Sequence, residues 1–88
     1  MSYEVVITAT AKRDLQRIPP RIVPAIIEFI FGEMAAHPRR LGKPLQRELD
    51  GTYSARRGPY RILYSIDDSV DRVNVLRIHH RAHIHHSD

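Results

Sequence analysis

The stretch Tyr60–Asp67 constrains the fold most strongly, because two sets of side chains alternate along it. One set is apolar or aromatic and consists of Tyr60, Ile62, Tyr64 and Ile66. The residues between them are Arg61, Leu63 and Ser65. Side chains two positions apart lie on the same face of a β-strand. The pattern therefore predicts a strand that packs its tyrosine and isoleucine face on a core and turns Arg61 toward an open face.

Two further strands are predicted beside this one. Thr52–Arg57 precedes it, and the Gly-Pro pair at 58–59 predicts the turn between them. The Asp-Asp-Ser sequence at 67–69 predicts a second turn, which is followed by a third strand over Arg72–Ile78. Sequential strands joined by short turns pair in antiparallel fashion, so this half of the chain is expected to form a meander.

Two helices are predicted in the first half of the chain. Thr10–Ile18 has apolar residues at helical spacing, with Thr10 as the expected N-cap. The prolines at 19 and 20 end this helix. Arg21–Ala36 has an apolar residue at every fourth position, at Ile22, Ile26, Ile30 and Met34. This spacing predicts a second helix with a broad apolar stripe, and the pair is expected to form an αα-hairpin.

The remaining segments complete the predicted order. Tyr3–Ala9 is short and rich in Val and Ile, which predicts a first strand. His37–Gly51 contains two prolines and two glycines and is expected to be mostly loop. The order β-α-α-β-β-β predicts an α+β fold, in which a two-helix hairpin packs on one face of a mainly antiparallel sheet. With 88 residues, one domain over 1–88 is expected.

Composition limits the class of protein. The chain is 42% hydrophobic, which is enough for a folded core. It contains no cysteine, so neither disulfides nor thiolate chemistry are expected. The first residues lack the pattern of a signal peptide, and no apolar run has the length of a membrane span. A cytoplasmic protein is the expectation.

The positive charge is concentrated in one part of the chain. The net charge is +4, and residues 39–61 alone contain seven Lys or Arg against two Asp or Glu. The basic residues here are Arg39, Arg40, Lys43, Arg47, Arg56, Arg57 and Arg61. Such a cluster is typical of a protein that binds a polyanion, most often nucleic acid. The alternative is a solvated basic surface with no ligand.

The arginines around the predicted turn are the most informative part of this cluster. If the loop consists of residues 58–59 alone, Arg56 lies opposite Arg61, and Ser54 lies beside Leu63. If the loop is one residue longer, Arg57 takes the place of Arg56, since a one-residue slip flips every side chain. In both registers two guanidinium groups share the open face. Like charges opposite each other are unfavourable in a sheet, so an anionic ligand is expected there.

The carboxyl end is rich in histidine. Five of the eight residues 79–86 are histidines, around Arg81. This tail has three interpretations: a solvated terminus, a metal site of clustered imidazoles, or acid–base chemistry near pH 7. No Cys or carboxylate stands at ligand spacing, which weighs against the metal.

Three segments resemble the RelE/ParE superfamily of toxins from type II toxin–antitoxin modules, on the RelE side. They are ITATAKRDLQRIPP, LGKPLQRELDGTYSARRGPYRILYSID and VNVLRIHHRAHI, and together they extend over nearly the whole chain. The resemblance implies the small α/β fold of that family. It also implies ribosome-dependent cleavage of the mRNA codon in the A site. In that reaction the ribose 2′-OH attacks the adjacent phosphate, and neither a metal nor another cofactor is needed.

The resemblance also implies roles for particular residues. Arg61 is similar to the family's phosphate-stabilising arginine, and Arg56 and Arg57 fall where the family has basic residues on the same face. Arg81 matches the arginine after the last strand. His85 stands where many members have a tyrosine, so His85 or His83 is expected to move protons. The expected RNA-binding residues are Arg39, Arg40, Lys43, Arg47 and Ser54.

Partners and alternatives follow from the same resemblance. A RelB-like antitoxin, the ribosome and mRNA are the implied partners, and operator DNA is bound only through the antitoxin complex. The basic loop His37–Asp50 and the open arginine face are the expected antitoxin surfaces. Some members have lysines in the strand before the turn, where this chain reads TYSA. The alternatives are a ParE-like toxin that acts on DNA gyrase without cleaving nucleic acid, and a weakly active toxin that mainly binds its antitoxin.

Overall fold

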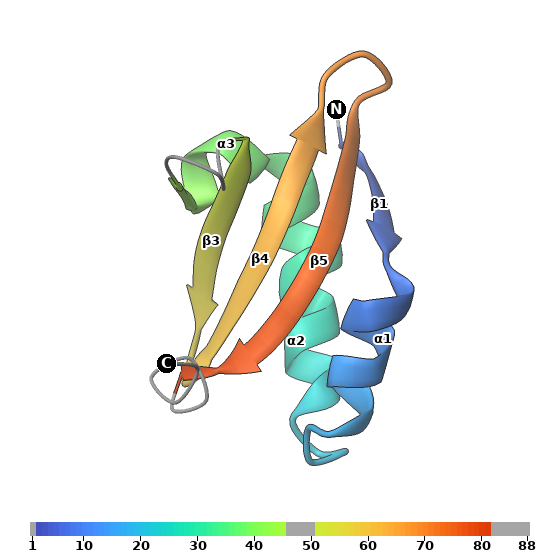
Figure 1. Cartoon of the computed structure of the whole chain (residues 1–88), viewed down its shortest axis with the longest axis vertical. Helices are drawn as coiled ribbons and strands as arrows, with labels where there is room; N and C mark the ends of the chain where they lie inside the picture. The colour runs from blue at the N-terminus through green and yellow to red at the C-terminus, as the bar shows by residue number, and fades with distance from the viewer. Residues whose placement is uncertain (1, 46–50, 82–88) are drawn as a thin grey trace.

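The computed structural model describes residues 2–45 and 51–81, and these residues form a five-stranded sheet with helices on one face (Figure 1). The strand order is β1-β5-β4-β3-β2. The strands are β1 (Glu4–Ile7), β2 (Lys43–Pro44), β3 (Thr52–Arg57), β4 (Tyr60–Asp67) and β5 (Arg72–His80). β1 is parallel to β5, and the other neighbours are antiparallel. The predicted α+β class and the bounds of β3 and β4 are confirmed.

The helices are α1 (Ala9–Gln16), α2 (Val23–Phe29), the π-helical turn η1 (Ile30–Met34) and α3 (Pro38–Leu41). In the view of Figure 1, α2 passes behind β4 and β5, and α1 lies next to α2, below β1. None of the helices in the described ranges is long and apolar enough to cross a membrane. The face of the sheet toward the viewer carries no helix in Figure 1, and we call it the open face.

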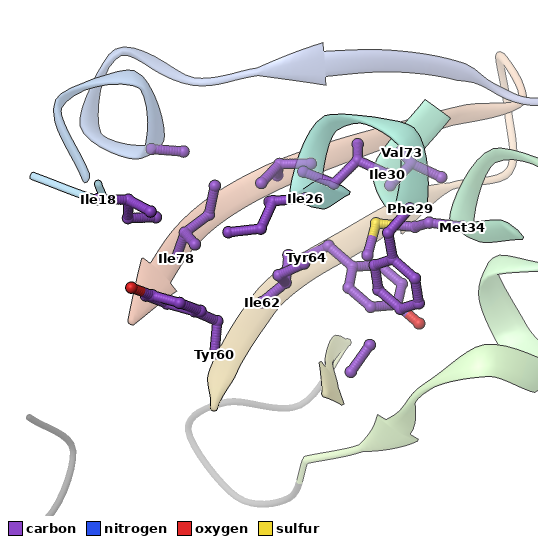
Figure 2. Close-up of a cluster of buried hydrophobic side chains, with 13 residues drawn as sticks. Ile18, Ile26, Phe29, Ile30, Met34, Tyr60, Ile62, Tyr64, Val73 and Ile78 are labelled. Carbon is purple, nitrogen blue, oxygen red and sulfur yellow. The ribbon is translucent and has the colours of Figure 1, made fainter. Parts of the chain in front are cut away.

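The core lies between α2–η1 and the covered face of the sheet (Figure 2). Tyr60, Ile62 and Tyr64 of β4 are buried, as the alternation predicts. From the helices, Ile26, Ile30 and Met34 of the predicted stripe are fully buried, and β5 contributes Val73, Val75 and Ile78. The fourth residue of the stripe, Ile22, is half-buried at the N-cap of α2. Burial of this apolar surface is the main force that holds the helices on the sheet.

Local differences from the predicted elements have identifiable causes. Helix α1 begins at Ala9, and not after Thr10, because the Thr8 hydroxyl accepts a hydrogen bond from the Ala11 N–H at 3.2 Å and acts as the N-cap. The second helix begins at Val23, two residues later than predicted, and has Pro24 in its first turn, where the missing N–H costs little. It continues through the wider π-turn η1, where the Ala35 N–H bonds to the Ile30 carbonyl.

The predicted loop His37–Gly51 contains the short helix α3 and strand β2, so the prediction of mostly loop was wrong for residues 38–41 and 43–44. A tertiary contact accounts for the difference. The hydroxyl of buried Tyr64 donates a 2.5 Å hydrogen bond to the Pro38 carbonyl and ties this segment to the sheet. Pro38 itself is suited to the first turn of a helix.

Helix α1 covers the edge of β5 that β1 leaves unpaired. β1 pairs only with residues 72–75 of β5. Beyond it, the Asp14 carboxylate of α1 accepts the Ile78 N–H at 2.9 Å and the Arg77 Nε–H at 2.9 Å. Asp14 is buried. Burial acts to raise the pKa of this carboxyl, but the hydrogen bonds from Arg77 and Ile78 outweigh it, and the pKa lies below its ordinary value.

Candidate functional site

The hairpin of β3 and β4 places the arginines. Its loop is the two-residue Gly58-Pro59, so Arg57 pairs with Tyr60 and Arg56 pairs with Arg61. Gly58 has a φ of 58°, in the left-handed region that glycine adopts without strain, and proline suits the next position. Of the two registers that the sequence allowed, the structure therefore has the one with Arg56 opposite Arg61.

The two neighbouring arginines of β3 lie on opposite faces. The Arg57 guanidinium carbon lies 6.0 Å from the ring centroid of Phe29 in α2, so Arg57 is on the helix side. Arg56 and Arg61 are therefore on the open face, one strand apart. Directly opposite residues have their Cβ atoms about 5 Å apart, which is close enough for both guanidinium groups to reach one phosphate.

Beside these arginines the open face is hollowed. The hollow has a volume of about 250 Å³ and is lined by Lys43, Leu45, Ser54, Arg56 and Arg61. It is smaller than the pockets of about 300 to 1,000 Å³ that enclose drug-sized ligands. Its size and open form are suited to one part of an extended chain, such as a phosphate with its sugar.

The segment that supplies Lys43 is held by a close backbone approach at Gly42. In register, Lys43 lies opposite Ser54 of β3. A Cβ atom on Gly42 would overlap the Tyr64 hydroxyl and lie 2.9 Å from the Ser54 carbonyl oxygen. Only glycine fits without displacing its neighbours, so this residue lets β2 pair with β3. Burial raises the pKa of Tyr64 to about 12, and its hydroxyl therefore remains protonated at physiological pH.

The charges of the site lack anionic partners in the part of the chain that the structure describes. There, the ion pairs are Arg39–Asp68, Arg72–Glu4 and Arg77–Asp14. None of these pairs contains Arg56, Arg61 or Lys43. Three cationic side chains thus surround one hollow. Repulsion among them raises the free energy of the protein without a ligand, and a bound anion would reduce that repulsion.

The other predicted site residues lie elsewhere. Arg39 of α3 bonds to the Tyr53 hydroxyl at 3.3 Å and pairs with Asp68, and it does not line the hollow. Its hydrogen bond to Asp68 raises the pKa of its guanidinium. Arg40 is exposed on α3. Arg81 is exposed at the end of β5, and its N–H bonds to the Pro59 carbonyl at 2.8 Å, which places its backbone beside the hairpin turn.

Arg47, His83 and His85 lie outside the described residues, so the predictions for them remain predictions. Within residues 2–45 and 51–81, no group of three or more His, Cys, Asp or Glu is arranged to hold a metal ion. The metal interpretation of the tail concerns residues outside those ranges as well.

Two residues at the site were not singled out from the sequence. Leu45 forms one wall of the hollow and lies within the segment His37–Gly51 that was expected to be mostly loop. His79 lies opposite Arg61 in the register of β4 with β5. The alternation in β4 alone could not reveal this pairing, because the register shifts between Leu63 and Tyr64.

Comparison with known proteins gives consistent results. Residues 5–85 match the family model described as the ParE toxin of the type II toxin–antitoxin system, parDE. The chain is 56% identical to toxin RelG of Mycobacterium tuberculosis over 85 residues, which cover 97% of this chain and 98% of RelG. It is 54% identical to toxin RelE of the same organism over 80 residues, 91% of this chain and 82% of that one.

A solved structure gives the same result for the fold. A chain in the crystal structure of the toxin–antitoxin complex RelBE2 from M. tuberculosis aligns with a TM-score of 0.88 at 56% identity. The alignment covers 92% of this chain and all of that chain. With a family model over most of the chain and two relatives above half identity, the protein belongs to the RelE/ParE superfamily and is a RelE-family toxin of a type II toxin–antitoxin system.

Proposed function

We propose that this toxin is a ribosome-dependent mRNA endonuclease that cleaves the codon in the A site. One observation carries the proposal: Arg56 and Arg61 lie side by side over a hollow of the open face. The similarity to RelE and RelG supports it on the RelE side of the superfamily.

The reaction that fits such a site is internal attack by the RNA on itself. The ribose 2′-oxygen attacks the adjacent phosphorus and the bond to the 5′-oxygen breaks, which leaves a 2′,3′-cyclic phosphate and a free 5′-hydroxyl. Negative charge builds up on the phosphate oxygens in the transition state. Arginine is suited to stabilise it, because its fork matches phosphate oxygens and it keeps its charge. Loss of one such donor typically lowers the rate by about 10² to 10³-fold.

In this proposal Arg61 and Arg56 hold the reacting phosphate. Lys43 and Ser54, at the same hollow, contact the flanking backbone of the RNA. Arg57 receives no role in the reaction, because it lies over Phe29 on the helix side. Arg81 binds RNA next to the hairpin turn, and His85 or His83 of the tail moves protons, as the family resemblance implies.

An antitoxin is part of the proposal. The relative in the RelBE2 structure is crystallised as a toxin–antitoxin complex. We infer that a RelB-like antitoxin binds this chain and covers the open face, where acidic segments would complement Arg56, Arg61 and Lys43. An antitoxin bound over these residues would prevent RNA from binding there, and this alone would inhibit the toxin. Operator DNA would then be bound only by the toxin–antitoxin complex.

The test is cleavage mapping on programmed ribosomes. Purified toxin is added to ribosomes that hold a defined mRNA, and the new 5′ ends are read by primer extension, beside the Arg61→Ala variant. The expected result is cuts at the A-site codon that disappear with Arg61→Ala, with fragments ending in a cyclic phosphate. An absence of cuts by folded wild-type toxin that still arrests cell growth would refute the nuclease and favour a ParE-like action on DNA gyrase.

A further inference from the structure

A row of three side chains crosses the open face at the level of the hollow. Arg56 of β3 pairs with Arg61 of β4, and Arg61 pairs with His79 of β5. Neighbouring strands are about 4.8 Å apart. His79 therefore lies on the strand next to Arg61, directly opposite the residue that is proposed to hold the reacting phosphate.

The side of the sheet on which His79 lies follows from its neighbours. Ile78 is buried in the core, and the ring of His80 packs edge-on against buried Tyr60, with centroids 5.2 Å apart. His80 is therefore on the helix side. Because side chains alternate along a strand, His79 lies on the open face with Arg61.

The charged groups around His79 come from three elements. Arg61 is on β4, and Arg77 and Arg81 are two residues away on either side. From α1, Asp14 interacts electrostatically with His79, while its oxygens accept hydrogen bonds from Arg77 and Ile78. A neutral imidazole can take up a proton, and histidine is the side chain whose charge ordinarily changes near neutral pH.

We propose that His79 is the general base of the cleavage reaction, an inference that rests on the proposed function. One imidazole nitrogen takes the proton of the ribose 2′-hydroxyl as the oxygen–phosphorus bond forms. The bond from phosphorus to the 5′-oxygen then breaks, and that oxygen takes a proton from a tail histidine or from water.

The experiment measures single-turnover cleavage of ribosome-bound mRNA from about pH 5.5 to about pH 8.5, a range that spans imidazole titration. The wild-type rate is expected to rise with pH on the acidic side, as the base becomes neutral. His79→Gln is expected to lower the maximal rate by about 100-fold or more and to remove this acidic limb. His80→Gln is the matched control: it changes the adjacent histidine on the other face and is expected to keep the limb.

A second variant separates chemistry from disturbance of the strand. His79→Ala leaves a gap that added imidazole can enter, and we expect added imidazole to restore part of its cleavage rate. His79→Gln with an unchanged rate and acidic limb, or a limb that disappears with His80→Gln instead, would overturn the inference. So would an alanine variant that is folded by circular dichroism but is not rescued. If wild-type toxin does not cleave, the proposed function itself fails and this inference fails with it.

Discussion

Replacement of Asp14 by alanine is expected to destabilise the protein by about 2 to 4 kcal/mol. The Ile78 N–H donates to this buried carboxylate at 2.9 Å, and a hydrogen bond to a charged group contributes about 1.5 to 3 kcal/mol. The Arg77 side chain is 43% exposed, so solvent screens its ion pair and limits the contribution to about 0.3 to 1 kcal/mol. Together these terms give the expected range.

The assay is urea denaturation followed by circular dichroism at pH 7, for the wild type and the Asp14→Ala variant. In thermal denaturation of the same two proteins, the midpoint should fall by at least about 8 °C for a domain of this size. Glu4→Ala is the matched control, because Glu4 also pairs with an arginine of β5 but is 60% exposed. Glu4→Ala should lose no more than about 1 kcal/mol of stability. If Asp14→Ala lost as little stability as Glu4→Ala, the conclusion that Asp14 stabilises the unpaired edge of β5 would be refuted.

The lowered pKa of Asp14 predicts that the stability of the protein depends on pH. The pKa of Asp14 is lower in the folded protein than its ordinary value of 3.8. The stabilisation it provides is therefore complete above that ordinary value and is lost as the pH falls through the lower folded value. The difference in stability between wild type and Asp14→Asn should be constant at neutral pH and shrink in acid. A difference that grows in acid would contradict the assigned direction.

Three other perturbations test the support of the site. Tyr64→Phe removes the hydrogen bond to the Pro38 carbonyl and should cost about 1 to 2 kcal/mol in urea denaturation; a neutral change would contradict it. Gly42→Ala should cost about 1 to 3 kcal/mol, because its Cβ would overlap the Tyr64 hydroxyl; an equally stable variant would show that β2 can move. Lys43→Ala should lower the salt dependence of RNA binding by about 0.7 in log–log slope, and an unchanged slope would exclude a phosphate contact at Lys43.

The sequence predicts local parts of this fold well. Alternation and the Gly-Pro pair suffice for the β3–β4 hairpin, because both strands and their turn depend on neighbouring residues. The apolar spacing likewise predicts the stripe with Ile26, Ile30 and Met34. These patterns also predict an open face that carries Arg61, which led to the candidate site.

What the sequence does not reveal depends on contacts between distant residues. The hydrogen bond from Tyr64 that ties down α3 joins residues 26 positions apart. The pairing of Arg61 with His79 depends on the register shift between β4 and β5, which no local pattern marks. The choice between Arg56 and Arg57 required the register of the hairpin and the contact of Arg57 with Phe29.

The central claim is that the reacting phosphate is held on the open face, by Arg56 beside Arg61. The most direct test compares two adjacent residues of one strand, Arg56→Ala and Arg57→Ala, in single-turnover cleavage of ribosome-bound mRNA, with both variants shown to be folded. We predict that Arg56→Ala loses about 100-fold or more of the rate and that Arg57→Ala stays near wild type. Equal losses in both variants, or a larger loss for Arg57→Ala, would contradict this account of the site.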